Sequence, residues 1–208
     1  MRKSVVLFAV VLMGMLSAGV ARAESVLYTT WGTFTNPNAG FTISNAAAPG
    51  GTSTIHDGTL TGSTLTFTGV ADLVDTPSDN PLGIFMSTTP LTKGEIDSYN
   101  GTTFTLTIDQ LDPGEVIGTV TGTITGTLKK STKGAGGSTL DLVWGGASVT
   151  LLGVTYAPAD IDIAGATFTT PTTLQGHVSA VPVPASALGG AGLFGFLSLA
   201  KLLKRRAA

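Results

Sequence analysis

The two histidines, His56 and His177, are the natural starting point for any acid–base chemistry in this chain. His56 is followed directly by Asp57, which makes it the one histidine with an acidic neighbour in sequence. A hydrolytic triad needs a hydroxyl, a histidine and a carboxylate that meet in space. Serines and threonines occur throughout the chain, however, and neither a Gly-x-Ser-x-Gly elbow nor a His-Glu-x-x-His motif is present. We therefore expect His56, Asp57 and Gly58 to form a turn, and we expect no catalytic residues.

Carboxylates offer a second candidate chemistry, because oxygen ligands suit Ca²⁺. Asp160 and Asp162 would share one face if they lie on a strand. The other cluster lies in a proline-containing stretch and its spacing matches no EF-hand loop. We expect solvated carboxylates and no cofactor, with three weak metal candidates, Asp72, Asp75 and Asp79, beside Asn80.

Aromatic side chains could stack on sugar rings, since their faces bury large areas against C–H surfaces. Scattered aromatics in a small domain are more often core residues, and we expect the core role here. The five candidates for such a platform are Trp31, Tyr28, Trp144, Tyr99 and Tyr156.

The elements that must position these side chains are β-strands, because the hydrophobic pattern repeats every two residues. Leu65 and Phe67 alternate with threonines, and residues 103–109 repeat the alternation. Val120, Ile124 and Leu128 do so within residues 116–128. Alternation of apolar residues with β-branched threonine is typical of a sheet with one solvated face. The same pattern recurs at 167–169 and 174–178.

Turn signals punctuate these segments and predict many short strands. They include Asp57-Gly58, Asn100-Gly101 and Asp112-Pro113-Gly114. We predict an all-β fold, an antiparallel β-sandwich that is jelly-roll-like, with a helical turn only at residues 91–98. Residues 115–128 and 138–144 should form a hairpin around the loop 129–137. Asn100-Gly101-Thr102 fits a glycosylation sequon, but we expect a hairpin turn there.

The N-terminus has the pattern of a signal peptide. Arg2 and Lys3 precede an apolar stretch of about a dozen residues, which is short for a membrane span. Ala21 and Ala23 provide the small residues that signal peptidase reads, so we predict residues 1–23 as the signal peptide, cleaved after Ala23.

The C-terminus combines a proline motif, an apolar run and a basic tail. Residues 185–203 would form a helix about 28 Å long, close to the roughly 30 Å of a bilayer core. Lys201 lies in the last turn, where its side chain can reach the headgroups. Lys204, Arg205 and Arg206 should stay on the cytoplasmic side by the positive-inside rule. We predict a transmembrane helix here.

This C-terminal arrangement resembles the PEP-CTERM sorting domain of Gram-negative bacteria over residues 181–208. The matching residues are Val181, Pro182, Pro184 and Ala185, followed by the apolar run and Lys204-Arg205-Arg206. Val183 stands where the best-known form of the motif has Glu. The resemblance implies recognition by an exosortase, an integral-membrane cysteine protease or transpeptidase. It also implies removal of the anchor, release to the cell surface or medium, and association with exopolysaccharide of a biofilm matrix.

Charge and cysteine content describe the body between the two ends. Seven of the 11 basic residues lie outside residues 24–180, which leaves four basic against 13 acidic residues and a formal net charge of −9. Such a body repels phosphate backbones, so we expect no nucleic-acid partner. The chain has no cysteine, so an exported body must be held together by its core. We predict residues 24–180 as a single domain.

These patterns predict an exported, non-enzymatic cell-surface or extracellular-matrix protein. Its expected partners are signal peptidase, an exosortase, exopolysaccharide and, before processing, the membrane. A carbohydrate-binding or adhesive module is the alternative, and an exported hydrolase is the third hypothesis.

Overall fold

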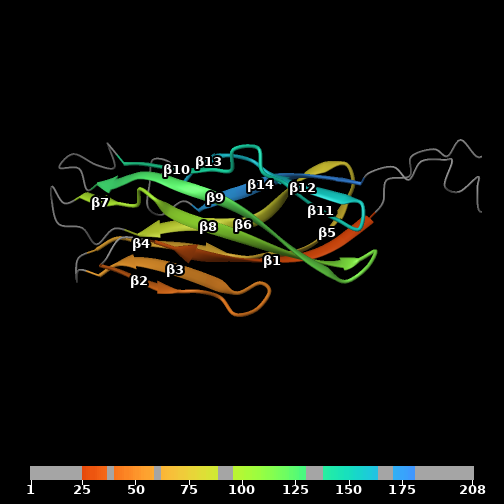
Figure 1. Cartoon of the computed structure of the whole chain (residues 1–208), viewed down its shortest axis with the longest axis horizontal. Coiled ribbons are helices and arrows are strands. Elements are labelled where there is room, and N and C mark those ends of the chain that lie inside the picture. Colours follow the sequence, from red (N-terminus) through yellow and green to blue (C-terminus); the bar gives the residue numbers. More distant parts are fainter. Residues whose placement is uncertain are drawn as a thin grey trace, which may run out of the picture. The chain divides into compact units, whose positions relative to one another are not determined.

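The computed structural model describes residues 25–36, 40–58, 62–88, 96–129, 138–163 and 171–180, and every regular element within them is a β-strand (Figure 1). All of these residues belong to one compact unit, Glu24–Ala180. The strands form two curled antiparallel sheets in a sandwich-like arrangement. The prediction of an all-β antiparallel fold is thus confirmed at that level.

Each sheet contains seven strands, and neighbours in each sheet are paired antiparallel. The first sheet has the order β13 (Ile161–Asp162), β10 (Thr139–Val143), β9 (Val116–Lys129), β8 (Thr102–Asp112), β1 (Ser25–Thr35) and β5 (Ala71–Asp75), with β7 (Ile96–Ser98) also paired to β9. The second has the order β11 (Val149–Leu151), β12 (Val154–Pro158), β14 (Thr172–Ala180), β6 (Ser78–Thr88), β4 (Thr64–Thr68), β3 (Thr52–Asp57) and β2 (Phe41–Ser44).

A cluster of phenylalanines joins the two sheets. Phe104 of β8 lies 4.7 Å from Phe67 of β4 and 5.0 Å from Phe85 of β6, measured between ring centroids. Phe34 of β1 lies 5.1 Å from Phe104. All four rings are buried, so aromatic packing between the inner faces supplies much of the hydrophobic stabilisation of the sandwich.

Close packing of this cluster requires a glycine on β1. A Cβ atom at Gly32 would lie 2.3 Å from the Phe104 ring and 2.8 Å from the Phe67 ring. Such distances are far inside van der Waals contact, so the absence of a side chain at Gly32 lets the rings approach the strand.

Polar side chains on the inner face of β1 also link the sheets. The Tyr28 hydroxyl donates to the Pro81 carbonyl at 2.9 Å, and the Thr30 hydroxyl donates to the Leu82 carbonyl at 2.8 Å. These bonds satisfy buried polar groups that would otherwise be costly to desolvate.

Most of the predicted alternation is confirmed. Leu65 and Phe67 are buried on β4, and Val120, Ile124 and Leu128 are buried on β9. Leu174 and Val178 are buried on β14. The predicted hairpin is also present, since β10 pairs with β9 from Thr139↔Thr127 to Val143↔Thr123. Residues 167–169 lie outside the described part of the chain.

Two local predictions around residues 96–102 were wrong. Ile96–Ser98 form strand β7 instead of a helical turn, because they pair with Thr127–Lys129 of β9. Asn100 and Gly101 do form a turn, with the Thr102 amide donating to the Tyr99 carbonyl. However, β7 and β8 both pair with β9 and not with each other, so this turn is a bend between two strands that follow the same partner. The Asn100 side chain holds this turn against β9, because its Oδ1 accepts a hydrogen bond from the Gly126 amide at 2.7 Å.

No helix occurs in the described residues, and hence none there is long and apolar enough to cross a membrane. The predicted transmembrane helix falls in residues 181–208, outside the described ranges.

Candidate functional site

His56 does not form a turn with Asp57. Both residues lie on strand β3, where successive side chains point to opposite faces of the sheet. His56 Nδ1 lies 2.9 Å from the Thr64 hydroxyl on β4, whereas Asp57 is on the same side as the buried Ile55. The neighbouring carboxylate therefore cannot orient the imidazole, and the pair lacks the geometry of a catalytic dyad.

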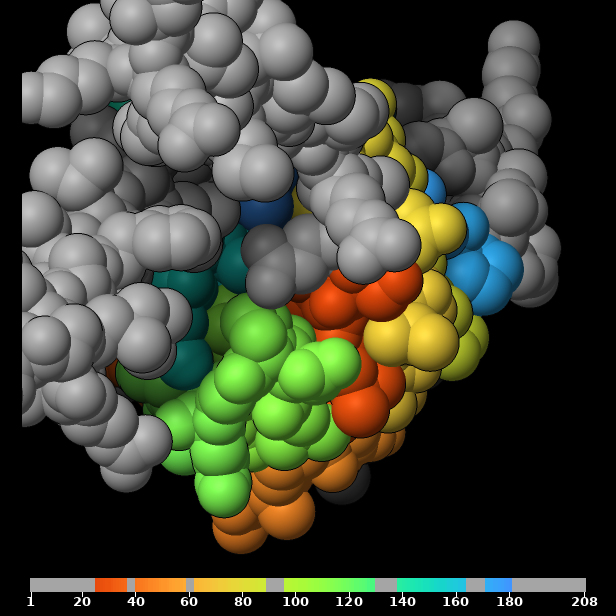
Figure 2. Space-filling model, turned by 90° about the vertical axis from the view of Figure 1, so that its right-hand side faces the viewer, coloured from red at the N-terminus to blue at the C-terminus, as the bar shows by residue number. Residues whose placement is uncertain are grey.

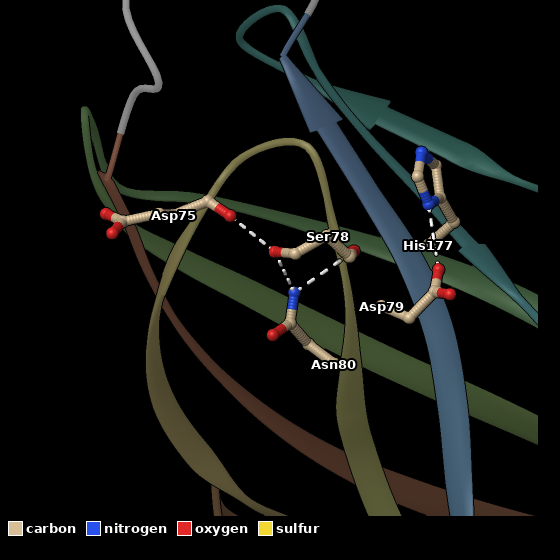
Figure 3. Close-up of polar contacts among 5 residues, drawn as sticks. All are labelled: Asp75, Ser78, Asp79, Asn80 and His177. Carbon is tan, nitrogen blue, oxygen red and sulfur yellow. Dashed lines mark hydrogen bonds and ion pairs between the residues drawn. The ribbon is translucent and has the colours of Figure 1, made fainter.

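A histidine–carboxylate pair does form at His177, with an acid 98 residues away. His177 of β14 is directly opposite Asp79 of β6, and its Nδ1 lies 2.8 Å from Asp79 Oδ1 (Figure 3). The two side chains are 54% and 79% exposed, so water screens the pair. Asp79 is the single side-chain hydrogen-bond partner of His177 within the described residues, and no nucleophilic hydroxyl bonds to the imidazole there.

The three weak metal candidates do not converge. Asp72 Oδ1 accepts from the Leu73 amide, Asp75 Oδ1 accepts from the Ser25 hydroxyl, and Asp79 pairs with His177. Figure 3 shows the Asp75 carboxylate directed away from Asp79. No group of three or more metal-binding side chains occurs in the part of the chain that the structure describes.

The turn beside these carboxylates is held by hydroxyl and amide groups. The Ser78 hydroxyl donates to the Asp75 carbonyl, and Asn80 Nδ2 donates to Ser78 Oγ at 2.7 Å (Figure 3). The Asn80 side-chain amide therefore helps to close the turn. Asp160 is also structural, because its Oδ1 accepts from the Trp144 amide at 2.6 Å.

Four of the five candidate aromatics belong to the core. Tyr28, Tyr99 and Tyr156 are fully buried and Trp144 is 4% exposed, so these four cannot form an exposed stacking platform. Burial raises the pKa of each of the three tyrosines well above its usual value near 10. Trp31 is the exception, since it is half-buried and faces away from the core on β1.

One buried polar cluster was missed in the sequence. Asp97 Oδ2 accepts from both the amide and the hydroxyl of Ser63, each at 2.6 Å. The Ser63 hydroxyl also lies 2.8 Å from the Tyr99 hydroxyl. The Tyr99 hydroxyl in turn donates to the Ser63 carbonyl at 3.1 Å. All three residues are buried, and their mutual hydrogen bonds leave no opening for a substrate. The cluster is therefore structural. Asp97 could be identified only once residues 96–98 were known to be a strand, with Ile96 and Ser98 exposed on either side.

A second buried carboxylate has no such partners. Asp109 lies on the outer face of β8, where period-two alternation predicts exposure, yet it is 8% exposed. Its Oδ1 is buried without a hydrogen-bond partner, and so is the hydroxyl of Thr29, which is directly opposite on β1. Unsatisfied buried groups are rare in folded proteins. The pair formed by Asp109 and Thr29, with Trp31 beside it, is therefore the candidate functional site of the body.

The remaining predicted functional residues lie outside the described ranges. These are the signal-cleavage residues Ala21 and Ala23, the sorting motif Val181, Pro182, Val183, Pro184 and Ala185, and the basic residues Lys201, Lys204, Arg205 and Arg206.

Searches of known proteins found no matching family model, no matching curated protein and no matching solved structure.

Proposed function

We propose that this chain is an exported, non-enzymatic cell-surface or extracellular-matrix protein whose C-terminus is processed by an exosortase. The observation that carries the proposal is the order of three signals in residues 181–208: the Val181-Pro182-Val183-Pro184 motif, an apolar run of helix length, and a basic tail. A signal-peptide pattern at residues 1–23 is consistent with the same route.

In this proposal residues 24–180 form the exported domain, and its β-sandwich is of the jelly-roll-like kind. Such a domain must be stable without disulfides, and the chain has no cysteine. The phenylalanine cluster between the sheets provides a core that is independent of redox conditions. The net charge of −9 on residues 24–180 favours solubility outside the cell.

We further propose that the exported domain associates with exopolysaccharide. An outward-facing indole is one group that can stack on sugars, and Trp31 has that position on the outer face of β1. A carbohydrate-binding or adhesive module is therefore the second candidate function. An exported hydrolase is the third, and among the described residues no nucleophile bonds to the exposed His177–Asp79 pair to support it.

The processing step is tested by replacing Pro182 and Pro184 with alanine in the native host. Two prolines at this spacing favour an extended, polyproline-like chain, which suits a protease cleft. We expect the double variant to accumulate uncut in the membrane fraction. Pro171→Ala is the matched control, because it changes a proline outside the motif and should leave processing unchanged. Normal release of the double variant would contradict the proposal.

A further inference from the structure

The carboxyl group of Asp109 is buried on the outer face of the first sheet. It is 8% exposed, and its Oδ1 is buried and makes no hydrogen bond or ion pair with another group in the described ranges. Desolvating a charge is costly unless a partner compensates it, so buried charges are normally paired. Asp97, the other buried acid on this sheet, follows that rule with two hydrogen bonds from Ser63.

Strand register identifies the groups around Asp109. Thr29 of β1 and Ile117 of β9 are its directly paired residues on either side. Trp31 and Thr107 form the next pair along β1 and β8, and Thr107 is also 8% exposed. Trp31 and Ile117 therefore carry large side chains on this face at positions paired with Thr107 and Asp109.

Exposed apolar side chains border this site. Leu73 of β5 is 64% exposed, Ile117 is 58% exposed and Leu111 of β8 is 40% exposed. Figure 2 shows the strands that carry them side by side, with the start of β1 (red-orange) between the β5–β6 segment (yellow) and the β8–β9 hairpin (green). A carboxylate surrounded by exposed apolar side chains is typical of a surface that binds an amphiphilic ligand.

The strands around Asp109 supply no basic side chain close to it. Across β5, β1, β8 and β9 the single basic residue is Lys129, at the last position of β9, whereas Asp109 pairs near the opposite end of that strand, with Ile117. The body as a whole carries a net charge of −9, which attracts cations. A Ca²⁺ ion requires six to eight oxygen ligands, and the described residues contain no group of three metal-binding side chains.

We infer that Asp109, Thr29 and Trp31 form a binding site for a sugar ring that carries a protonated amine. The amine would pair with the Asp109 carboxylate in a charge-assisted hydrogen bond. Thr29 Oγ1, which is buried without a partner directly opposite Asp109, can accept a second hydrogen bond from the same amine, and the apolar face of the ring can stack on the indole of Trp31. The exopolysaccharide proposed above would then contain amino sugars, and this inference rests on that proposed association.

Threonine rows beside the site favour a polysaccharide over a basic peptide. Thr33, Thr105 and Thr121 form one cross-strand row, with Thr105 and Thr121 hydroxyls 3.1 Å apart, and Thr35, Thr103 and Thr123 form the next. Each hydroxyl both donates and accepts, as sugar hydroxyls do. An arginine side chain would match Asp109 and Trp31 but would leave these rows unused.

The test measures binding of the full chain, purified in detergent, to a soluble glucosamine oligomer and to its N-acetylated counterpart of equal length. We expect the glucosamine oligomer to bind and the acetylated oligomer, which lacks the charge, to bind at least about tenfold more weakly. Asp109→Asn and Trp31→Ala should each weaken glucosamine binding by about tenfold or more, with thermal melting used to show that both variants are folded. Asp141→Asn, an exposed acid on β10 of the same sheet, is the control and should change binding less than about twofold.

Equal binding of the two oligomers, or unchanged binding by folded Asp109→Asn, would overturn the inference. Binding of an arginine-rich peptide without any binding of the glucosamine oligomer would assign the site to a protein partner and would overturn it as well. Failure of this inference is distinguishable from failure of the proposed function. A processed, matrix-associated protein that ignores the oligomer contradicts the site alone, whereas an unprocessed membrane form that binds it contradicts the sorting route alone.

Discussion

Ser63 contacts Asp97 through two hydrogen bonds, one from its backbone amide and one from its hydroxyl, and both end on the same carboxylate oxygen at 2.6 Å. The contact joins β7 of the first sheet to the residue that precedes β4 of the second. Tyr99 completes the cluster through its hydroxyl. A buried carboxyl group therefore helps to connect the two sheets.

Replacement of Asp97 by alanine should destabilise the fold. The change removes the acceptor of two buried donors, and each unsatisfied donor carries a desolvation cost. We expect a loss of about 3 kcal/mol in the free energy of unfolding, measured by urea denaturation. Asp141→Ala, at an exposed position on β10, is the control and should change stability by no more than about 0.5 kcal/mol. Equal effects for the two variants would show that the cluster contributes nothing.

Replacement of Asp109 by asparagine should have the opposite effect. Asparagine has nearly the same shape without the charge, so the cost of desolvating a carboxylate at this buried position is removed. We expect the free energy of unfolding to rise by about 1 kcal/mol. Asp141→Asn measured in parallel controls for the change in net charge. A loss of stability on Asp109→Asn would mean that the carboxylate is compensated in the folded protein.

Alkaline pH should unfold the protein in a step that the tyrosines report. Burial raises the pKa of Tyr28, Tyr99 and Tyr156, the three tyrosines of the chain, while exposed tyrosines titrate near pH 10. Above about pH 10 the unfolded state therefore loses protons that the folded state retains, so stability is full below that pH and falls above it.

Absorbance at 295 nm measures this directly. We expect no tyrosinate signal from the native protein near pH 10, followed by ionisation of all three tyrosines together with loss of the near-ultraviolet circular dichroism. Gradual ionisation centred near pH 10 in a protein that stays folded would contradict the burial of these side chains.

Alanine at Gly32 should destabilise the aromatic core. The added methyl group would meet the rings of Phe104 and Phe67 at 2.3 and 2.8 Å, so the rings or the strand must shift. Overpacking of this kind costs about 1–3 kcal/mol. Thr33→Ala on the outer face of the same strand is the control, with an expected cost of about 1 kcal/mol or less. Unchanged stability of Gly32→Ala would show that the cluster has room for a side chain.

Strand identity and inward-facing residues could be predicted because period-two alternation is a local property. Leu65, Phe67, Val120, Ile124 and Leu128 were placed correctly for this reason. The hairpin of β9 and β10 could also be predicted, because its two strands are close in sequence. Strand partners far apart in the chain could not, and the pairing of His177 with Asp79 is an example.

Errors arose where long-range pairing overrides local signals. The helical turn predicted at residues 91–98 is wrong at 96–98, because pairing with β9 decides the conformation there. Asn100-Gly101 has the local signal of a hairpin turn, but the shared partner of β7 and β8 is not a local property. Asp109 was expected on a solvated face. The signal that could have identified its burial is Ile117, an apolar residue at an outward position of the neighbouring strand.

The most direct test of the proposed sorting route is intact-mass measurement of the protein, after fractionation, from its native host with and without the exosortase. The proposal predicts a soluble or surface species that begins at Glu24 and ends near Pro184, and that disappears when the exosortase is deleted. A membrane-bound species that retains Arg206 in both strains would contradict it, because the C-terminus would then be a permanent anchor.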